Sequence, residues 1–354
     1  MRTSLYMFLI VIMAVGSSCS SEKKQTGKTG KFTLVYSGNI GARYDPCGCR
    51  IPLGGLARRS TELKEIREAN ENVIVVDTGA LINEKHRLYP PFEITSRMQA
   101  RMVSEMMDRI GIDAVNVSSM DLSVGVDTLK AFDESVSFPW LSANIVRKEN
   151  GETPFLPHFT KSAGDLTIGV FGIMDQTSLG TPLLGPDSPL EVLDPATVAS
   201  EQVKELSDAD YVIMLAYMDQ QRVEALADQL QGVDLIVYGH TREHNPSSDH
   251  TFFVPYKHGS VLIARCPDGG RVIGVMNIEI VNGLTDLVKA DEIVDLRPTS
   301  VKEATPVVKE SNFHNEFIDL DPGIRRDRPL QELLDEQGKI IEELRSELKK
   351  QIAN

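Results

Sequence analysis

Cysteine and histidine are the residues whose types and spacing most plainly suggest chemistry. Cys47 and Cys49 are separated by one glycine, Cys266 follows a later apolar run, and His240 ends another. Thiolates with a histidine suit zinc, copper(I) or an iron centre. One interpretation of the sequence is therefore a single metal ion held by Cys47, Cys49 and His240, although no cofactor is the favoured prediction. Cys266 could supply a third sulfur.

The same cysteines admit two other interpretations. One is a loop disulfide to Cys266, which leaves one free thiol; a direct Cys47–Cys49 bond would be strained and reducible. The other is that the cysteines stay reduced without a role.

The N-terminus has the layout of an export signal. Arg2 precedes an apolar run over residues 5–15 that is too short to span a bilayer, and small residues lead to Cys19. This layout resembles a bacterial lipoprotein signal. It predicts a signal peptide over 1–19, a lipid anchor on Cys19, and a polar, flexible tether over 20–30; plain secretion is the alternative. The predicted location is the cell envelope, facing the periplasm or the cell surface.

Composition indicates a globular chain that does not bind nucleic acid. Hydrophobic residues make up 41% and charged residues 25% of the 354 positions, which is ordinary for folded domains. The formal net charge is −14, and lysines and arginines are nowhere concentrated. A phosphate backbone is held by clustered basic residues, so nucleic acid is excluded as a partner.

Strand and helix patterns alternate through most of the chain. Short apolar runs typical of buried strands cover residues 32–36, 73–76, 114–117, 166–171, 211–215 and 235–237. Amphipathic helical patterns cover residues 56–69, 95–110, 195–206 and 221–230. This alternation predicts a layered α/β protein whose sheets are covered by helices.

The C-terminal third has a different pattern. Strand-like runs without helices occupy 260–264, 272–281 and 284–294, the last two joined by an Asn-Gly turn, which predicts an antiparallel section. Residues 297–328 are mixed in character and predict an irregular connection. Residues 329–354 predict a charged amphipathic helix, which either packs on its own domain or binds a protein partner.

One segment resembles a known family. Residues 46–59, Pro-Cys-Gly-Cys-Arg-Ile-Pro-Leu-Gly-Gly-Leu-Ala-Arg-Arg, contain an element similar to one in 5'-nucleotidase-like metallophosphoesterases of the calcineurin-like superfamily. Further landmarks follow in that family's order at residues 76–79, 138–144, 168–173 and 233–240. The resemblance implies a four-layer α/β/β/α metallophosphoesterase sandwich over residues 31–296, with the C-terminal helix as an addition.

The resemblance also implies that the metal ligands are mostly lost. The family holds two divalent ions with Asp, Asn and His side chains from several strand ends. The matching positions here are Asn39, Gly41, Ala80, Ser119, Met120, Tyr217, His240 and Arg242. Only His240 keeps the family's residue, and Ala80 stands where a carboxylate should bridge both ions. No catalytic residue and no cofactor of the family type is therefore predicted.

Three functional hypotheses follow. The favoured one is a degenerate family member that has lost hydrolysis and binds a ligand or partner; Arg43 and Arg242 suggest an anionic small ligand. The second is an active phosphoesterase with substitute ligands. Candidate substitutes close to the lost positions are Asp77, Asp121, Asp219, His244 and His258. The third is a thiol-ligated metal or redox protein that uses Cys47 and Cys49.

Overall fold

The computed structural model describes residues 27–85, 87–175, 188–239, 255–266, 269–281 and 313–353. Several sequence predictions fall outside these ranges: the signal peptide, Cys19, most of the tether, the strand at 284–294 with its turn, His240, Arg242 and His244.

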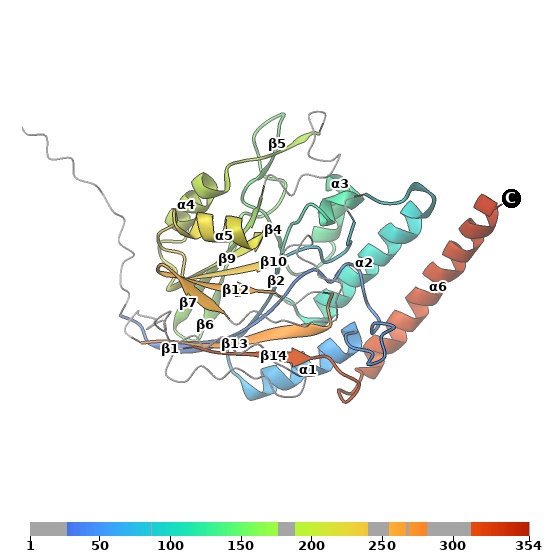
Figure 1. Cartoon of the computed structure of the whole chain (residues 1–354), viewed down its shortest axis with the longest axis horizontal. Helices are drawn as coiled ribbons and strands as arrows, with labels where there is room; N and C mark the ends of the chain where they lie inside the picture. Colours follow the sequence, from blue (N-terminus) through green and yellow to red (C-terminus); the bar gives the residue numbers. More distant parts are fainter. Residues whose placement is uncertain are drawn as a thin grey trace, which may run out of the picture.

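Two six-stranded mixed sheets form the centre of the molecule (Figure 1). The first runs in the order β14 (Phe313–Asp319), β13 (Val272–Ile280), β1 (Gly30–Ser37), β2 (Val73–Asp77), β3 (Ala114–Asn116), β4 (Trp140–Leu141). The second runs in the order β11 (Tyr256–His258), β12 (Val261–Arg265), β10 (Leu235–Gly239), β9 (Tyr211–Tyr217), β7 (Leu166–Met174), β6 (His158–Ala163). A small sheet pairs β5 (Ile145–Arg147) with β8 (Leu190–Val192).

Helices lie on the outer faces of the two large sheets. The helices are α1 (Leu56–Ala69), α2 (Glu93–Ile110), α3 (Val126–Asp133), α4 (Pro195–Glu205), α5 (Gln220–Ala227) and α6 (Arg328–Ala353), with 3-10 turns η1 (Pro90–Phe92) and η2 (Asp121–Val124). Figure 1 shows α4 and α5 on one side of the molecule and α1, α2 and α6 on the other.

Three separate hydrophobic cores correspond to three interfaces between four layers. Leu34 on β1 packs with Ile168 on β7 in the core between the sheets. The next residue, Val35, packs on the opposite face in the core under α1, α2 and α6. Successive strand residues point to opposite faces, so strands that are covered on both sides are apolar throughout. A third core lies under α4 and α5. The predicted α/β/β/α sandwich is confirmed.

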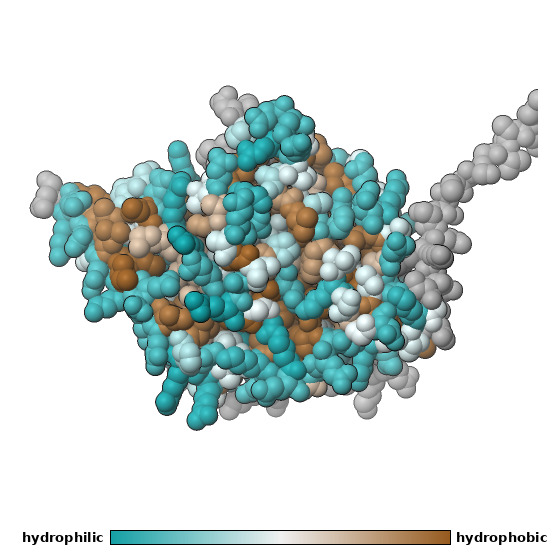
Figure 2. Space-filling view, turned by 180° about the vertical axis from the view of Figure 1, so that it is seen from behind, coloured by the Kyte–Doolittle hydropathy of each residue, from teal (hydrophilic) through white to brown (hydrophobic). Residues whose placement is uncertain are grey.

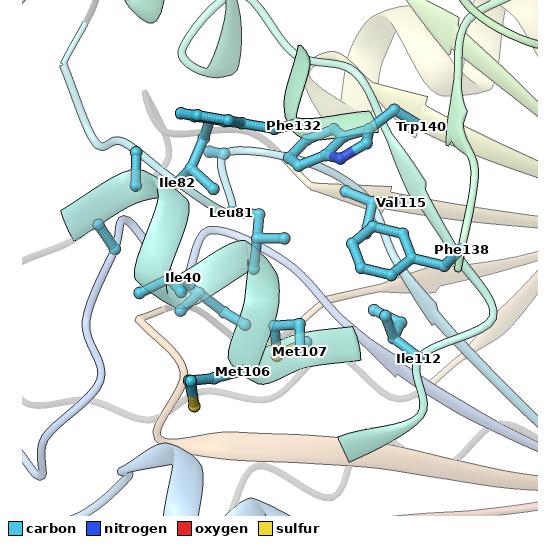
Figure 3. Close-up of a cluster of buried hydrophobic side chains, with 14 of the residues drawn as sticks. Ile40, Leu81, Ile82, Met106, Met107, Ile112, Val115, Phe132, Phe138 and Trp140 are labelled. Carbon is cyan, nitrogen blue, oxygen red and sulfur yellow. The ribbon is translucent and has the colours of Figure 1, made fainter. Parts of the chain in front are cut away.

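The core under α2 combines aliphatic side chains with methionines and aromatic rings (Figure 3). Met107 on α2 and Trp140 on β4 are both fully buried in this cluster. The rings of Phe138 and Trp140 lie 6.1 Å apart at an interplanar angle of 44°. This core fixes the position of α2 against the strands whose ends carry the candidate site.

A glycine in β13 makes room for an aromatic ring of β1. Gly274 pairs with Tyr36, and a β-carbon on Gly274 would collide with the ring of Tyr36. The Tyr36 hydroxyl donates to Asn315 Oδ1 on β14 over 2.8 Å. The ring therefore crosses β13 and connects β1 to the edge strand.

The C-terminal strands correct one sequence prediction. Residues 297–328, predicted as an irregular connection, contain β14, which pairs antiparallel with β13. The run at 260–264 forms β12, which pairs antiparallel with β11, as predicted, and in parallel with β10 on its other side. The pairings of β14 with β13 and of β12 with β10 join segments distant in sequence, and local patterns do not specify them.

Helix α6 packs on its own domain along its first half. Leu330, Leu334 and Ile341 are buried in the core with α1 and α2. The Arg345 guanidinium donates to Gln99 Oε1 on α2 over 3.0 Å. Toward its C-terminus the helix extends away from the sheets (Figure 1), and Ile352 is 55% exposed. In the described part of the chain no helix is both long and apolar enough to cross a membrane.

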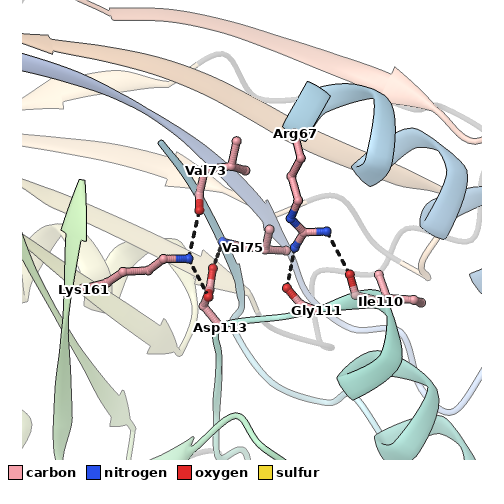
Figure 4. A network of polar contacts seen from close by, with 7 residues as sticks. All are labelled: Arg67, Val73, Val75, Ile110, Gly111, Asp113 and Lys161. Atoms are coloured by element: carbon pink, nitrogen blue, oxygen red, sulfur yellow. Dashed lines mark hydrogen bonds and ion pairs between the residues drawn. The ribbon is translucent and has the colours of Figure 1, made fainter. Parts of the chain in front are cut away.

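A polar network ties the two sheets together at the amino ends of β2 and β3 (Figure 4). Lys161 on β6 donates to Asp113 Oδ1 over 2.7 Å and to the carbonyl of Val73 over 3.0 Å. Asp113 also accepts from the amide of Val75 over 2.8 Å, and Arg67 on α1 donates to the last turn of α2. These contacts lie at the strand ends opposite to the candidate site.

Candidate functional site

The carboxyl ends of the parallel strands from both sheets meet at one edge of the sandwich. A β-carbon on Gly239, at the end of β10, would collide with Thr78 Oγ1 at the end of β2. A β-carbon on Gly38, after β1, would lie 3.3 Å from the Cys266 β-carbon after β12. Ligands of open α/β sheets bind at the carboxyl ends of strands, so this edge is the candidate site.

The loops after β1 and β2 are joined directly to each other. Three backbone hydrogen bonds run from the amides of Asn39, Gly41 and Ala42 to the carbonyls of Gly79, Ala80 and Leu81, over 2.9, 2.7 and 2.8 Å. Asn39, Ala42 and Ala80 adopt positive φ angles of 54°, 60° and 54°. Such strained conformations persist only where surrounding contacts hold them.

Asp121 fastens these loops to the loop after β3. Its carboxylate accepts from the amides of Ala80 (2.8 Å), Ile82 (3.0 Å) and Ser118 (3.1 Å), and from the Ser118 hydroxyl (2.6 Å). The side chain is fully buried. Burial raises the pKa of Asp121 to about 6, although the four donors oppose the rise. We call residues 38–42, 78–82 and 118–121 the closed loops.

Asp77 forms a second inward-facing group. Its Oδ2 accepts from the Ser37 hydroxyl over 2.7 Å, and its Oδ1 accepts from the amide of Gly79 over 2.9 Å. Arg59 on α1, also buried, donates to Ser37 Oγ over 2.8 Å. Burial raises the pKa of Asp77, while the Ser37 hydroxyl and the Arg59 charge pull it down. Asp77 is therefore a strand-end turn residue.

The described family ligand positions fall within this region, and most of their side chains offer no atom suited to a hard cation. Ala80, Ser119, Met120 and Tyr217 are all buried. Ala80 contributes a methyl group and Met120 a thioether, neither of which suits Mg²⁺, Mn²⁺ or Ca²⁺. Among the described residues, no three His, Cys, Asp or Glu side chains lie close enough to share a metal ion. The described part of the site therefore does not fit a binuclear centre; His240 and Arg242 lie outside it.

The proposed substitute ligands have other contacts. Asp219 caps α5 by accepting from the amide of Arg222 over 3.0 Å. His258 lies on the edge strand β11, where its Nε2 contacts Asp228 Oδ1 at 2.8 Å. Asp77 and Asp121 are engaged by the loops themselves, and His244 lies outside the described residues.

The cysteines correct one prediction. Cys47 is half-buried and Cys49 exposed, both as thiols, on the loop before α1. Cys266 is a buried thiol that donates to the carbonyl of Ser37 over 3.0 Å. The alternative of a disulfide between that loop and Cys266 is therefore wrong, because Cys266 is held beneath the strand ends. His240, the remaining member of the predicted soft site, lies outside the described residues.

The sequence did not predict the structural role of two asparagines that position the site. The Asn116 side chain donates to the carbonyls of Thr78 and Ile173, each over 3.2 Å, and so bridges the two sheets. Asn144 donates to the carbonyl of Met174 over 2.7 Å and accepts from its amide over 3.0 Å. A usable signal existed for Asp121, since Ser118 and Asp121 have the i, i+3 spacing of a capping box.

Comparisons with known proteins agree with this geometry. The chain is 25% identical to 5'-nucleotidase of Rattus norvegicus over 283 residues, which covers 72% of this chain and 47% of that protein. It is 26% identical to 5'-nucleotidase of Homo sapiens over 246 residues, covering 64% and 41%. A 5'-nucleotidase precursor from Thermus thermophilus superposes with a TM-score of 0.68 at 19% identity, covering 89% and 59% of the chains. The chain belongs to the calcineurin-like phosphoesterase superfamily.

The calcineurin-like phosphoesterase YfkN from Bacillus subtilis has the same fold, with a TM-score of 0.66 at 17% identity over 90% of this chain and 99% of that one. No protein-family model matches the chain. The chain spans about half the length of the curated relatives it matches. The described residues of the chain thus carry a phosphoesterase-like fold without a group of side chains that could hold a metal ion.

Proposed function

We propose that this phosphoesterase-fold protein does not hydrolyse phosphate esters by two-metal chemistry. Its proposed function is to bind a ligand or a protein partner in the bacterial cell envelope. The observation that carries the proposal is the Asp121 carboxylate, whose four donors all come from the closed loops. Three of these donors bind Oδ2 and one binds Oδ1, so the carboxylate is turned toward the loops.

The physical reason is competition for lone pairs. Two-metal hydrolysis needs carboxylate, amide and imidazole groups that converge on an open cleft and polarise a phosphate between two cations. Here the amides of Ala80 and Ile82 point toward Asp121, so the loop after β2 presents positive dipoles inward. Opening it would leave a buried carboxylate and several donors without partners, at a cost of about 1–3 kcal/mol for each group.

An active phosphoesterase with rearranged ligands is the competing proposal. The relatives named 5'-nucleotidase favour it, because those proteins are named as enzymes. It would require donors from outside the described residues, such as His240 and His244, because Asp77 and Asp121 are engaged.

The proposed location follows from the N-terminal pattern. An apolar run that leads through small residues to Cys19 supports export and lipid attachment. Cys19 would then bind the membrane, and residues 20–30 would separate the anchor from the fold.

The proposed binding surface for a protein is the exposed part of α6 and the groove between α6 and α2. Ile340 is 52% exposed and Ile352 55%, and Ile340 borders a shallow groove with Met98 and Met102 on α2. Figure 2 shows hydrophobic surface on the side where α6 lies. An anionic ligand is less well supported, because Arg43 already pairs with Glu84 at 2.5 Å.

Metal content and turnover test the proposal together. We would purify the whole chain without chelator, measure its metals, and assay Mn²⁺-supplemented protein on 5'-AMP and on a generic phosphodiester, with a 5'-nucleotidase as positive control. We expect no stoichiometric metal and no turnover. About two ions per chain with turnover would overturn the proposal.

A further inference from the structure

The loop that carries Cys47 and Cys49 has a firmly held base. The Cys47 amide donates to the Leu53 carbonyl over 2.8 Å, and the Gly54 amide donates to the Leu320 carbonyl over 2.8 Å. The buried Arg58 guanidinium donates to the carbonyls of Pro52, Gly54 and Leu320. We call residues 43–54 the thiol loop.

The tip of the thiol loop presents both sulfurs to solvent. Gly48, Cys49 and Arg50 are exposed, and a β-carbon on Gly48 would meet nothing within 4 Å. Cys47 Sγ lies 3.8 Å from the carbonyl oxygen of Ile51, within the range for a weak sulfur hydrogen bond. The fold thus leaves this dithiol open to another molecule.

The two thiols are not equivalent. Partial burial raises the pKa of Cys47, but hydrogen bonds from the Cys49 thiol and from backbone amides outweigh burial, so the net pKa is lowered. The pKa of Cys49 is raised, first by its hydrogen bond to Cys47. Cys47 is therefore the better nucleophile, although Cys49 is more accessible.

Arginines of neighbouring elements interact electrostatically with this pair. The charge of Arg271 lowers the pKa of both thiols, and the charge of Arg43 lowers the pKa of Cys49. The charge of Arg271 favours the Cys47 thiolate, and Arg58 interacts with it electrostatically. Cationic neighbours are typical of reactive thiolates rather than of inert cysteines.

We propose that Cys47 and Cys49 form a thiol–disulfide exchange site that acts on an accessible disulfide of another molecule. This site is independent of the proposed loss of hydrolysis, because the thiol loop lies outside the closed loops.

The exchange proceeds in two balanced steps. The Cys47 thiolate attacks one sulfur of the substrate disulfide; that S–S bond breaks, a mixed disulfide forms on Cys47, and the released thiolate takes a proton from water. Cys49 then loses its proton to solvent and attacks Cys47 Sγ. The mixed disulfide breaks and the second substrate thiolate leaves. The substrate disulfide is reduced to two thiols, and the protein dithiol is oxidised to a Cys47–Cys49 disulfide.

The single intervening glycine sets the character of that disulfide. A ring closed over one residue departs from relaxed disulfide geometry, which makes the bond easy to reduce. Other thiols would therefore reduce the Cys47–Cys49 disulfide readily, which regenerates the dithiol.

Oxidised glutathione provides a direct probe. The whole reduced chain is mixed with it, quenched with acid, and mapped by mass spectrometry. We expect a Cys47–Cys49 disulfide in the wild type and a glutathione adduct trapped on Cys47 in C49S. In C47S, the adduct on Cys49 should form about tenfold more slowly. Arg271→Gln should slow capture at both thiols, because the charge of Arg271 lowers the pKa of each, while buried Cys266 serves as the internal unreactive control.

Three outcomes would overturn the proposal. The first is equal capture rates at Cys47 in C49S and at Cys49 in C47S. The second is the absence of a Cys47–Cys49 disulfide in the wild type under any glutathione ratio. The third is one tightly held metal ion per chain that protects both thiols, which would assign the pair to metal binding. Circular dichroism checks that each variant is folded.

Discussion

Two loop regions at the rim of the first sheet use their polar groups in opposite ways. In the closed loops the carboxylate of Asp121, and at the end of β2 beside them the carboxylate of Asp77, accept hydrogen bonds from their own surroundings and are buried. In the thiol loop, hydrogen bonds hold only the base, and both sulfurs reach the surface. Internal hydrogen bonds thus hold the closed loops, where the resemblance places metal ligands. The reactive groups lie in the thiol loop instead.

The sharpest test of this contrast is a matched pair of glycines. Gly79, in the closed loops, has φ 105°, and a β-carbon there would lie 2.7 Å from the Asn116 carbonyl oxygen. Gly79→Ala should lower the free energy of unfolding by about 4 kcal/mol through backbone strain and overpacking. Gly48→Ala, in the thiol loop, should change it by less than about 0.5 kcal/mol. Urea unfolding of both variants measures the difference, and equal effects would remove the distinction between the regions.

The next test removes the carboxylate that fastens the closed loops. Asp121→Ala should lower the free energy of unfolding by about 3 kcal/mol at pH 5, because the amides of Ala80 and Ile82 and the Ser118 hydroxyl lose their acceptor. The control is Asp194→Ala, which removes an exposed N-cap of α4 and should cost about 1 kcal/mol. A cost for Asp121→Ala no greater than for the control would show that the loops are held by other contacts.

A smaller change in the free energy of unfolding is expected when pH varies, because Asp121 titrates. The folded-state pKa of Asp121 is about 6, above its ordinary 3.8, so the folded protein binds this proton more tightly than the unfolded chain does. Its stabilising contribution is complete below about pH 4 and is lost as pH rises through about 6. Between pH 4 and pH 7 the wild type should lose about 2 to 3 kcal/mol relative to Asp121→Asn, which lacks this titration. Parallel stability curves for the two proteins would contradict the assignment.

Much of the fold could be predicted because its signals are local. Helix α1 occupies the range 56–69 expected from its apolar spacing, and the apolar runs at 73–76 and 211–215 form β2 and β9. Strand β14 could not be predicted, because its residues 313–319 are mixed in character. They form a strand by pairing with β13, about forty positions earlier, and through the contact from Tyr36 to Asn315.

For the site, the sequence predicted which residues stand at the positions of the family's ligands. Aligned motifs place Ala80 and Tyr217 at positions where the resemblance implies metal ligands. They could not show how the loops there are held, because Asp121 receives donors from residues 39 and 41 positions earlier. Sequence proximity instead suggested Asp121 as a metal ligand, whereas folding directs its oxygens toward backbone amides.

The sequence by itself determined the layered α/β architecture, the superfamily and the absence of a carboxylate at Ala80, because periodicity, motif order and residue identity are properties of the chain. Only the tertiary structure decided which polar groups meet. It placed Cys266 in the interior, closed the loops around Asp121, and left Cys47 and Cys49 beside Arg271 at the surface. Hydrogen bonds and pKa shifts depend on distance and burial, which the fold creates between residues far apart in sequence.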